Sequence, residues 1–362
     1  MTRPLLLTPG PLTTAPRVRR AMDADWGSRD PAFIALTAEL RERLLVVANG
    51  AGTHVAVPIQ GSGTYALEAA ADTLIGPDDR LLVLINGAYG ERMAAIARRL
   101  GRQVAVLHWE EDEPVDPSAV AAALRDDPAI THVAVVHVET TTGLRNPLEA
   151  IAATVADTGR RLIVDAMASF GALPIDLATL PAAAILASSN KCLEGPPGLA
   201  FALVDRAVLE GCAGRSRSTS LDLHAQWRGF EGNGQWRFTP PVQVVAATVE
   251  ALRLLDAEGG AAARLDRYAA NLDVLLAGAG RLGLELYLDR DLQAPIIATF
   301  RRPPDLDFAA LYDALAARGF LIYPGKLTRG ESFRIGCIGA VTPADFTRLV
   351  AALEPALAAA RS

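Results

Sequence analysis

Lysine is almost absent from the 362-residue sequence, because only Lys191 and Lys326 occur among its 35 basic residues and the others are arginine. The arginine guanidinium stays protonated and cannot serve as an amine nucleophile. Chemistry that needs an amine side chain is therefore excluded everywhere except at these two positions. Lys191 lies in ILASSNKCLEGPPGLAF, among small residues that follow an apolar segment, which is an unusual place for a surface cation.

Cysteines, long apolar segments and blocks of one charge are also scarce. The three cysteines form an odd set without metal-ligand spacing, which excludes a disulfide framework and favours a reducing compartment. The three consecutive leucines near the N-terminus are too few for a signal peptide, and no apolar segment is long enough to span a bilayer. The net charge of -6 is spread along the chain, which argues against a nucleic-acid surface. We expect a cytoplasmic protein with small-molecule partners and no metal.

Short apolar segments alternate with longer amphipathic ones from residue 53 onward. The short segments are rich in β-branched residues and bounded by turn residues, which predicts strands. The amphipathic segments between them predict helices, several of which end at a glycine. This rhythm predicts an α/β fold with a mainly parallel sheet flanked by helices. The predicted strands are HVAVPIQ, RLLVLIN, QVAVLHW, ITHVAVVHVE, RLIVDA, AAAILASS and GLAFALVD.

The alternation stops at residues 211–241, which are rich in glycine and arginine and too irregular for one element. A long helical pattern follows, and the C-terminal segments indicate a smaller α+β domain. We place the boundary near Glu258 to Gly260. The predicted parts are an N-terminal arm that contributes to the active site or the small domain, a large cofactor-binding domain and a small C-terminal domain, at residues 1–15, 16–258 and 259–362.

Loops at the carboxyl ends of parallel strands are the expected place for a ligand. The first such loop, QGSGTYALEAA, places Ser62, Gly63 and Thr64 at the start of a predicted helix, where backbone amides and hydroxyls can hold a phosphate. A tight structural turn is the alternative. The loop also resembles a dinucleotide fingerprint, but the next strand ends at Asn86, where that fingerprint requires an acid.

Two further strand ends carry candidates for contact with a planar ring. Tyr89, in NGAYGER, can stack on such a ring or pack beneath its own loop. The threonines of HVETTTG, among them Thr140, can donate to a ring substituent or cap the following turn.

Asp165 ends an apolar strand, and Lys191 lies between two predicted strands of a buried sheet, where an unpaired charge would be costly. Asp165 therefore needs a cationic or strongly donating partner. Lys191 needs a partner or a covalent role, because a buried lysine loses its charge readily and becomes a nucleophile. A phosphate cradle, a stacking aromatic, an aspartate and a lysine, in this order, match the requirements of pyridoxal 5'-phosphate (PLP). Lysine bonds to its aldehyde, and aspartate keeps its ring nitrogen protonated.

Ten sequence segments, spread in order from residue 5 to residue 339, resemble the class V, fold-type I aminotransferases. They are LLLTPGPLTT, QGSGTYALEA, NGAYGERM, ETTTGLRNP, IVDAMASFGALPID, SSNKCLEGPPG, SRSTSLDL, QWRFTPP, YPGK and FRIGCIG. The resemblance implies a large PLP-binding domain, a smaller C-terminal domain and a homodimer whose active site lies at the subunit interface.

The resemblance also implies a role for each matching residue. Lys191 would be the Schiff-base lysine and the acid/base that moves a proton between the substrate and the cofactor C4′. Asp165 would pair with the pyridine nitrogen, and Tyr89 would stack on the ring. Arg334 would clamp the anionic end of the substrate, because a planar guanidinium suits a carboxylate or a phosphonate. The remaining cofactor contacts would come from Ser62, Gly63, Thr64, Thr140, Asn190 and, from a second subunit, Thr239.

The detailed matches imply transfer of the amino group of 2-aminoethylphosphonate to pyruvate, which gives phosphonoacetaldehyde and L-alanine. Alanine:glyoxylate or serine:pyruvate transamination is the first alternative, and a PLP-dependent lyase is a more remote one. Cys192 is interpreted as a packing residue, which argues against a desulfurase. The roles of four residues stay open: Arg217, Trp236, Arg237 and Lys326.

Overall fold

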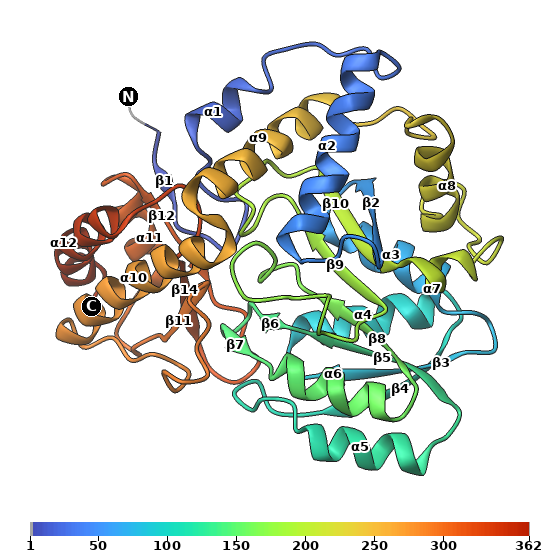
Figure 1. Ribbon diagram of the computed structural model, residues 1–362. Helices are drawn as coiled ribbons and strands as arrows, with labels where there is room; N and C mark the ends of the chain where they lie inside the picture. The colour runs from blue at the N-terminus through green and yellow to red at the C-terminus, as the bar shows by residue number, and fades with distance from the viewer. Residues whose placement is uncertain (1–2, 362) are drawn as a thin grey trace.

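A seven-stranded sheet forms the centre of the molecule in the computed structural model, which describes residues 3–361 (Figure 1). The strand order is β2-β10-β9-β8-β5-β3-β4, and β10 runs in the direction opposite to the other six strands. The strands are β2 (His54–Gln60), β3 (Arg80–Ile85), β4 (Gln103–His108), β5 (Ile130–Val136), β8 (Arg161–Asp165), β9 (Ala184–Ser188) and β10 (Leu199–Asp205).

Helices cover both faces of this sheet, because successive strand residues point to opposite sides and both sides are apolar. Leu82, Val133 and Val164 belong to one core, whereas Leu81, Ala134 and Ile163 belong to the other. The first core packs against α2 (Pro31–Val47), α5 (Pro117–Asp126), α6 (Leu148–Asp157) and α9 (Val242–Glu258). The second packs against α3 (Gly63–Leu74), α4 (Ala88–Arg99), α7 (Arg206–Glu210) and α8 (Leu223–Asn233).

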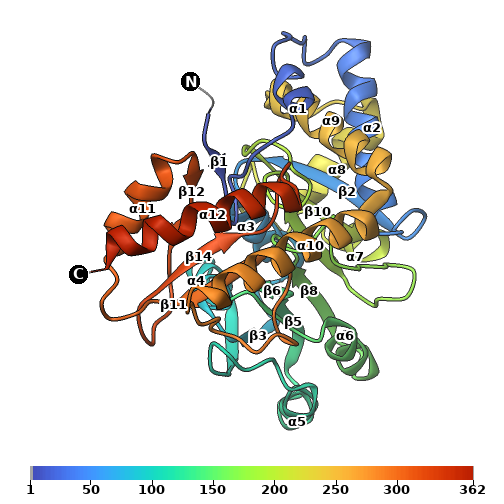
Figure 2. The ribbon, with the colours of Figure 1, turned by 90° about the vertical axis from the view of Figure 1, so that its left-hand side faces the viewer.

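A smaller α/β unit follows α9, with its own apolar core (Figure 2). Its antiparallel sheet has the order β11-β14-β13 and packs against three helices. The N-terminal strand β1 (Leu5–Leu6) pairs with β12 (Phe320–Leu321), so the start of the chain joins this unit. The other elements are α10 (Gly260–Arg281), β11 (Ile297–Arg301), α11 (Phe308–Ala316), β13 (Tyr323–Pro324), β14 (Ser332–Gly336), α12 (Pro343–Ala360), α1 (Pro16–Arg20), β6 (Val138–Glu139) and β7 (Leu144–Arg145).

The predicted mainly parallel sheet flanked by helices is confirmed, and all seven predicted strands are present with small changes at their ends. The segment predicted as one strand, residues 130–139, is divided into β5 and β6. The predicted domain boundary falls where α9 ends at Glu258 and α10 begins at Gly260; the division into domains stays a prediction. Within residues 3–361, no helix combines the length and the apolar character needed to cross a membrane.

Candidate active site

The candidate residues gather where the parallel strands end, as the topology requires. Asp165 is the last residue of β8, and Lys191 lies in the loop between the neighbouring strands β9 and β10. The charges of Asp165 and of Arg334, a residue of β14, are both near enough to influence the pKa of Lys191. The sheet edge and the small unit therefore supply one common site.

Lys191 is held beneath the N-terminal segment. Its Nζ donates to the carbonyl of Pro9 at 2.6 Å. Gly10 passes directly over the lysine in a left-handed conformation, with φ of 113°, and a Cβ atom there would lie 2.7 Å from Lys191 Cδ. Burial, assisted by the charges of Arg334 and Lys326, lowers the pKa of Lys191 from 10.5 to about 8. The amine is thus easier to deprotonate than that of an ordinary lysine.

Asp165 has one satisfied and one unsatisfied oxygen. Its Oδ1 accepts a hydrogen bond of 2.9 Å from the backbone N–H of Met167, whereas the buried Oδ2 has no partner among the described residues. Burial raises the pKa of Asp165 from 3.8 to about 6, although the Met167 hydrogen bond and the charges of Lys191 and Arg92 oppose the rise. Such an orphaned carboxylate oxygen is costly, and a protonated ring nitrogen is a fitting partner for it.

Arg334 is a buried cation on the central strand of the small sheet, where β11 and β13 flank it. Its Nε donates to the carbonyl of Pro324 at 3.1 Å, and its Nη1 donates to the carbonyl of Thr140 at 2.9 Å. These two contacts fix the plane of the guanidinium, and within residues 3–361 they leave the second Nη1 proton and both Nη2 protons for a ligand. The contact with Thr140, a residue of the loop after β6, also joins the two units at the site.

The N-terminus of α3 provides the predicted phosphate cradle. Ser62 is the N-cap residue in extended conformation, but its side chain makes no capping hydrogen bond. Gly63 begins the helix against the loop after β8, and a Cβ atom there would lie 2.5 Å from Met167 Sδ. Ser62, Gly63 and Thr64 thus present a hydroxyl and the first amides of a twelve-residue helix next to the Asp165 loop.

Tyr89 lies in the first turn of α4, where its backbone N–H is bound by Glu139, a residue that the sequence did not indicate as part of the site. The backbone N–H of Tyr89 donates to Glu139 Oε2 at 3.1 Å, and the hydroxyl of Thr141 donates to Glu139 Oε1 at 3.1 Å. Burial raises the pKa of Glu139 from 4.5 to about 7. The guanidinium of Arg92 lies over the Tyr89 ring, 4.8 Å from its centroid.

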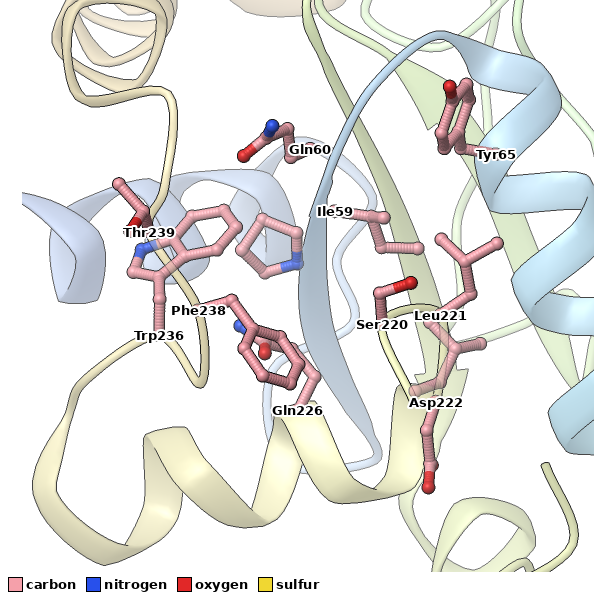
Figure 3. Close-up of a pocket in the computed structure, with 12 residues that line it drawn as sticks. Ile59, Gln60, Tyr65, Ser220, Leu221, Asp222, Gln226, Trp236, Phe238 and Thr239 are labelled. Atoms are coloured by element: carbon pink, nitrogen blue, oxygen red, sulfur yellow. The ribbon is translucent and has the colours of Figure 1, made fainter. Parts of the chain in front are cut away.

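Thr239 and Asn190 differ in how they relate to this site. Asn190 directly precedes Lys191, and its carbonyl faces Gly10. Thr239 instead lines a surface pocket of about 420 Å³ with Gln60, Tyr65 and Trp236 (Figure 3). Neither Asp165 nor Lys191 lines that pocket. The structure of one chain therefore does not bring Thr239 together with the other predicted contacts.

The residues fit PLP, judged by this geometry. The buried amine with a lowered pKa would react with its aldehyde, the orphaned carboxylate oxygen would pair with its protonated ring nitrogen, and the uncapped helix N-terminus would hold its phosphate. Each of these features would be unfavourable without a ligand, and one molecule accounts for all three.

The fold is that of the fold-type I PLP-dependent aminotransferases, and the comparison with known families agrees. Residues 28–303 match the family model of the class V aminotransferases. The chain belongs to this family.

Individual relatives and a solved structure are similar to the chain over nearly its whole length. The chain is 51% identical to the 2-aminoethylphosphonate–pyruvate transaminase of Pseudomonas fluorescens strain Pf0-1, over 98% of this chain and 96% of the relative. It is 52% identical to the 2-aminoethylphosphonate–pyruvate transaminase 2 of Burkholderia lata, over 99% of this chain and 96% of the relative. The crystal structure of ureidoglycine-glyoxylate aminotransferase from Bacillus subtilis superposes with a TM-score of 0.91 at 29% identity, covering 99% of this chain and 94% of that one.

Proposed function

We propose that this protein transfers the amino group of 2-aminoethylphosphonate to pyruvate and releases phosphonoacetaldehyde and L-alanine. The observation that carries the proposal is the identity of 51% to 52%, over nearly the whole chain, with relatives that bear this activity in their names. The reaction balances, because one water supplies the oxygen of the aldehyde and the keto oxygen of pyruvate leaves as another water when the amino group takes its place.

PLP is the cofactor in this proposal. When bound, it supplies a ring that accepts the electrons released as a carbon–hydrogen bond of the substrate breaks. Asp165 Oδ2 would pair with the ring nitrogen, and Tyr89 would stack on the ring. Ser62, Gly63 and Thr64, at the start of α3, would hold the phosphate, while Thr140 and Asn190 would contact the ring hydroxyl side or the phosphate.

Lys191 both holds the cofactor and moves the proton. A pKa of about 8 leaves about one amine in ten neutral at pH 7, whereas a lysine with a pKa of 10.5 would have about one in three thousand neutral. The neutral Nζ takes the proton from the carbon that bears the amino group of the donor and returns one to the keto carbon of the acceptor. The carbonyl of Pro9 orients this amine between the two events.

Arg334 binds the anionic end of both substrates. A phosphonate and a carboxylate each present two oxygens to a planar guanidinium, and the contacts of Arg334 with Pro324 and Thr140 keep its plane fixed. One residue therefore serves donor and acceptor in turn.

We further propose a homodimer in which Thr239 of one subunit contacts the cofactor phosphate of the other. The position of Thr239 in a separate surface pocket supports this arrangement, as does the exposure of the large apolar side chains of Tyr65 and Phe238 beside it. A second copy of the chain would cover these side chains.

The first test is the reaction of the purified enzyme, without any keto acid, with three amino donors. 2-Aminoethylphosphonate should bleach the visible cofactor band at a far lower concentration than serine or alanine, and pyruvate should restore it. Bleaching by serine or alanine alone would assign the chain to alanine:glyoxylate or serine:pyruvate transamination. Absence of the band, even with added PLP, would contradict the role of Lys191.

A further inference from the structure

The loop that carries Lys191 contains a backbone conformation that needs external support. Glu194 adopts the left-handed conformation, with φ of 60°, although it is not glycine. Such a residue costs of order 1 kcal/mol or more and persists where its surroundings hold it. Its N–H donates to the carbonyl of Lys191 at 2.8 Å, so this conformation closes the turn that begins at the lysine.

Side chains of α10 hold this turn. The carboxylate of Glu194 accepts a hydrogen bond of 2.6 Å from the Tyr268 hydroxyl and forms an ion pair of 2.8 Å with Arg267. Arg264, which is 1% exposed, donates to the carbonyl of Cys192 at 2.9 Å. The carbonyls of the lysine and of the residue after it are therefore both fixed, one by the turn itself and one from α10.

The same side chains of α10 also hold the segment that follows β14, the strand of Arg334. Nη1 of Arg267 donates to the carbonyls of Gly339 and Val341, at 2.6 and 2.9 Å. The Tyr268 oxygen accepts a longer hydrogen bond of 3.4 Å from the N–H of Gly339. Arg267 thus contacts the lysine loop through Nη2 and the Arg334 segment through Nη1.

We propose that Glu194 and Arg267 are positioning residues that fix Lys191 relative to Arg334 across the joint between the large and small units. This inference rests on the function proposed above, in which one residue moves the proton and the other binds the anion. Since the substrate connects these two residues, their separation determines whether the amine reaches the carbon from which the proton leaves. Neither Glu194 nor Arg267 needs to touch the substrate.

Glu258 offers a matched control within the same network. It ends α9, and its carboxylate pairs with Arg264 and Arg267 at 2.7 Å each. Among the described contacts it makes no hydrogen bond to the lysine loop. Glu194→Gln and Glu258→Gln therefore remove the same charge from the same network, but only the first weakens the hold on the turn at Lys191.

The experiment measures steady-state kinetics together with the attachment of the cofactor to Lys191. To follow attachment, PLP is added to the apoenzyme and samples are reduced with borohydride at timed intervals. The fraction of the Lys191 peptide that carries the cofactor is then measured by mass spectrometry. Glu194→Gln should lower kcat about tenfold to a hundredfold, leave both KM values within about threefold, and slow attachment about tenfold. Tyr268→Phe, which removes the hydrogen bonds of the hydroxyl with Glu194 and Gly339 but no charge, should act in the same direction more weakly. Glu258→Gln should lower the melting temperature while leaving kcat and attachment within about twofold.

The proposal is overturned if Glu194→Gln and Tyr268→Phe leave both readouts unchanged. It is also overturned if Glu258→Gln slows attachment as much as Glu194→Gln does, because the network would then act only as a scaffold. The attachment readout does not depend on the donor. If the unaltered enzyme attaches PLP but does not consume 2-aminoethylphosphonate, the proposed substrate fails while this inference is still tested.

Discussion

At the scale of single residues, Asp165 combines a function with a cost to stability. Its Oδ2 is buried without a partner among the described residues. The pKa of Asp165 in the folded protein, about 6, exceeds the value of 3.8 expected in the unfolded chain. Folding therefore takes up a proton between these pH values, and the stability contributed by Asp165 falls as the pH rises from about 4 to about 6. The shift corresponds to about 3 kcal/mol above that window.

Asp165→Asn should accordingly separate stability from activity. In enzyme freed of PLP, the variant should gain melting temperature relative to the unaltered protein as the pH rises from 5 to 7, because it lacks the titrating carboxyl. The loaded variant should lose at least about a hundredfold in kcat, since the ring nitrogen loses its anionic partner. Thermal melts across this pH range test the effect on stability, and steady-state rates test the effect on kcat. A melting-temperature gain of the variant that shrinks with rising pH would contradict the proposed titration of Asp165.

Arg334→Lys tests the shared anion site. Lysine keeps the charge but lacks the planar fork, so the KM values of 2-aminoethylphosphonate and pyruvate should rise together, each by about tenfold or more. Arg301→Lys, at an exposed position of the neighbouring strand β11, is the matched control and should leave both values unchanged. A rise for only one substrate would show that donor and acceptor use different anion sites.

The sequence predicts Asp165 but not Glu139, although the same argument applies to both. Each ends an apolar strand, where a lone carboxylate is costly. In HVETTTG the sequence indicates the threonines rather than Glu139, because hydroxyl residues after a strand are typical of a turn or of a ligand contact. Glu194 could not be predicted, since its partners Arg264 and Arg267 are about seventy positions away in sequence.

At the scale of elements, the strands that are buried on both faces were predictable and the connections less so. β8, β9 and β10 are short, continuous apolar segments, a pattern that is typical of strands buried on both faces of a sheet. The segment 130–139 satisfies the same criterion throughout, yet the chain breaks from the sheet at His137, whose N–H donates to the carbonyl of Asp165. α8 was missed within the irregular segment 211–241, because its glycine and tryptophan content does not suggest a helix.

The N-terminus of α3 permits a prediction about cofactor affinity. Gly63→Ala would place a Cβ atom 2.5 Å from Met167 Sδ, so the Met167 side chain would have to move within the space between the helix start and the Asp165 loop. The dissociation constant of PLP should rise about tenfold, since the added methyl group and the displaced side chain would crowd the first amides of the helix, where the phosphate is proposed to bind. Gly232→Ala in α8, where a Cβ atom meets nothing within 4 Å, should leave this constant unchanged. Fluorescence titration with PLP compares them, and equal constants for both variants would contradict the predicted cradle.

At the scale of the whole molecule, the proposed dimer makes a prediction about mixed subunits. Lys191→Arg disables the site of its own subunit, whereas Thr239→Glu should repel the phosphate in the site of its partner. A dimer with one subunit of each kind then has one site with both defects and one intact site. Equal mixing should restore about a quarter of the normal activity.

The mixing experiment requires that each variant alone be dimeric and inactive. Light scattering verifies the dimer, and an activity assay of each variant verifies the loss of activity. If Thr239 served its own subunit instead, every site would keep one defect and mixing would restore nothing. Recovery of activity thus depends on which chain supplies Thr239, and mixed dimers without activity would exclude the shared site.

The pairing of β1 with β12 has a consequence for how the protein is made. Leu5 lies opposite Phe320 in this parallel pair, and the segment just after Leu6 supplies the Pro9 carbonyl that holds the amine of Lys191. During synthesis Leu5 leaves the ribosome long before Phe320 is translated. The strands of the large sheet all precede β12 in the chain and can assemble before β1 finds its partner, so the lysine acquires its final surroundings only after β12 has been translated.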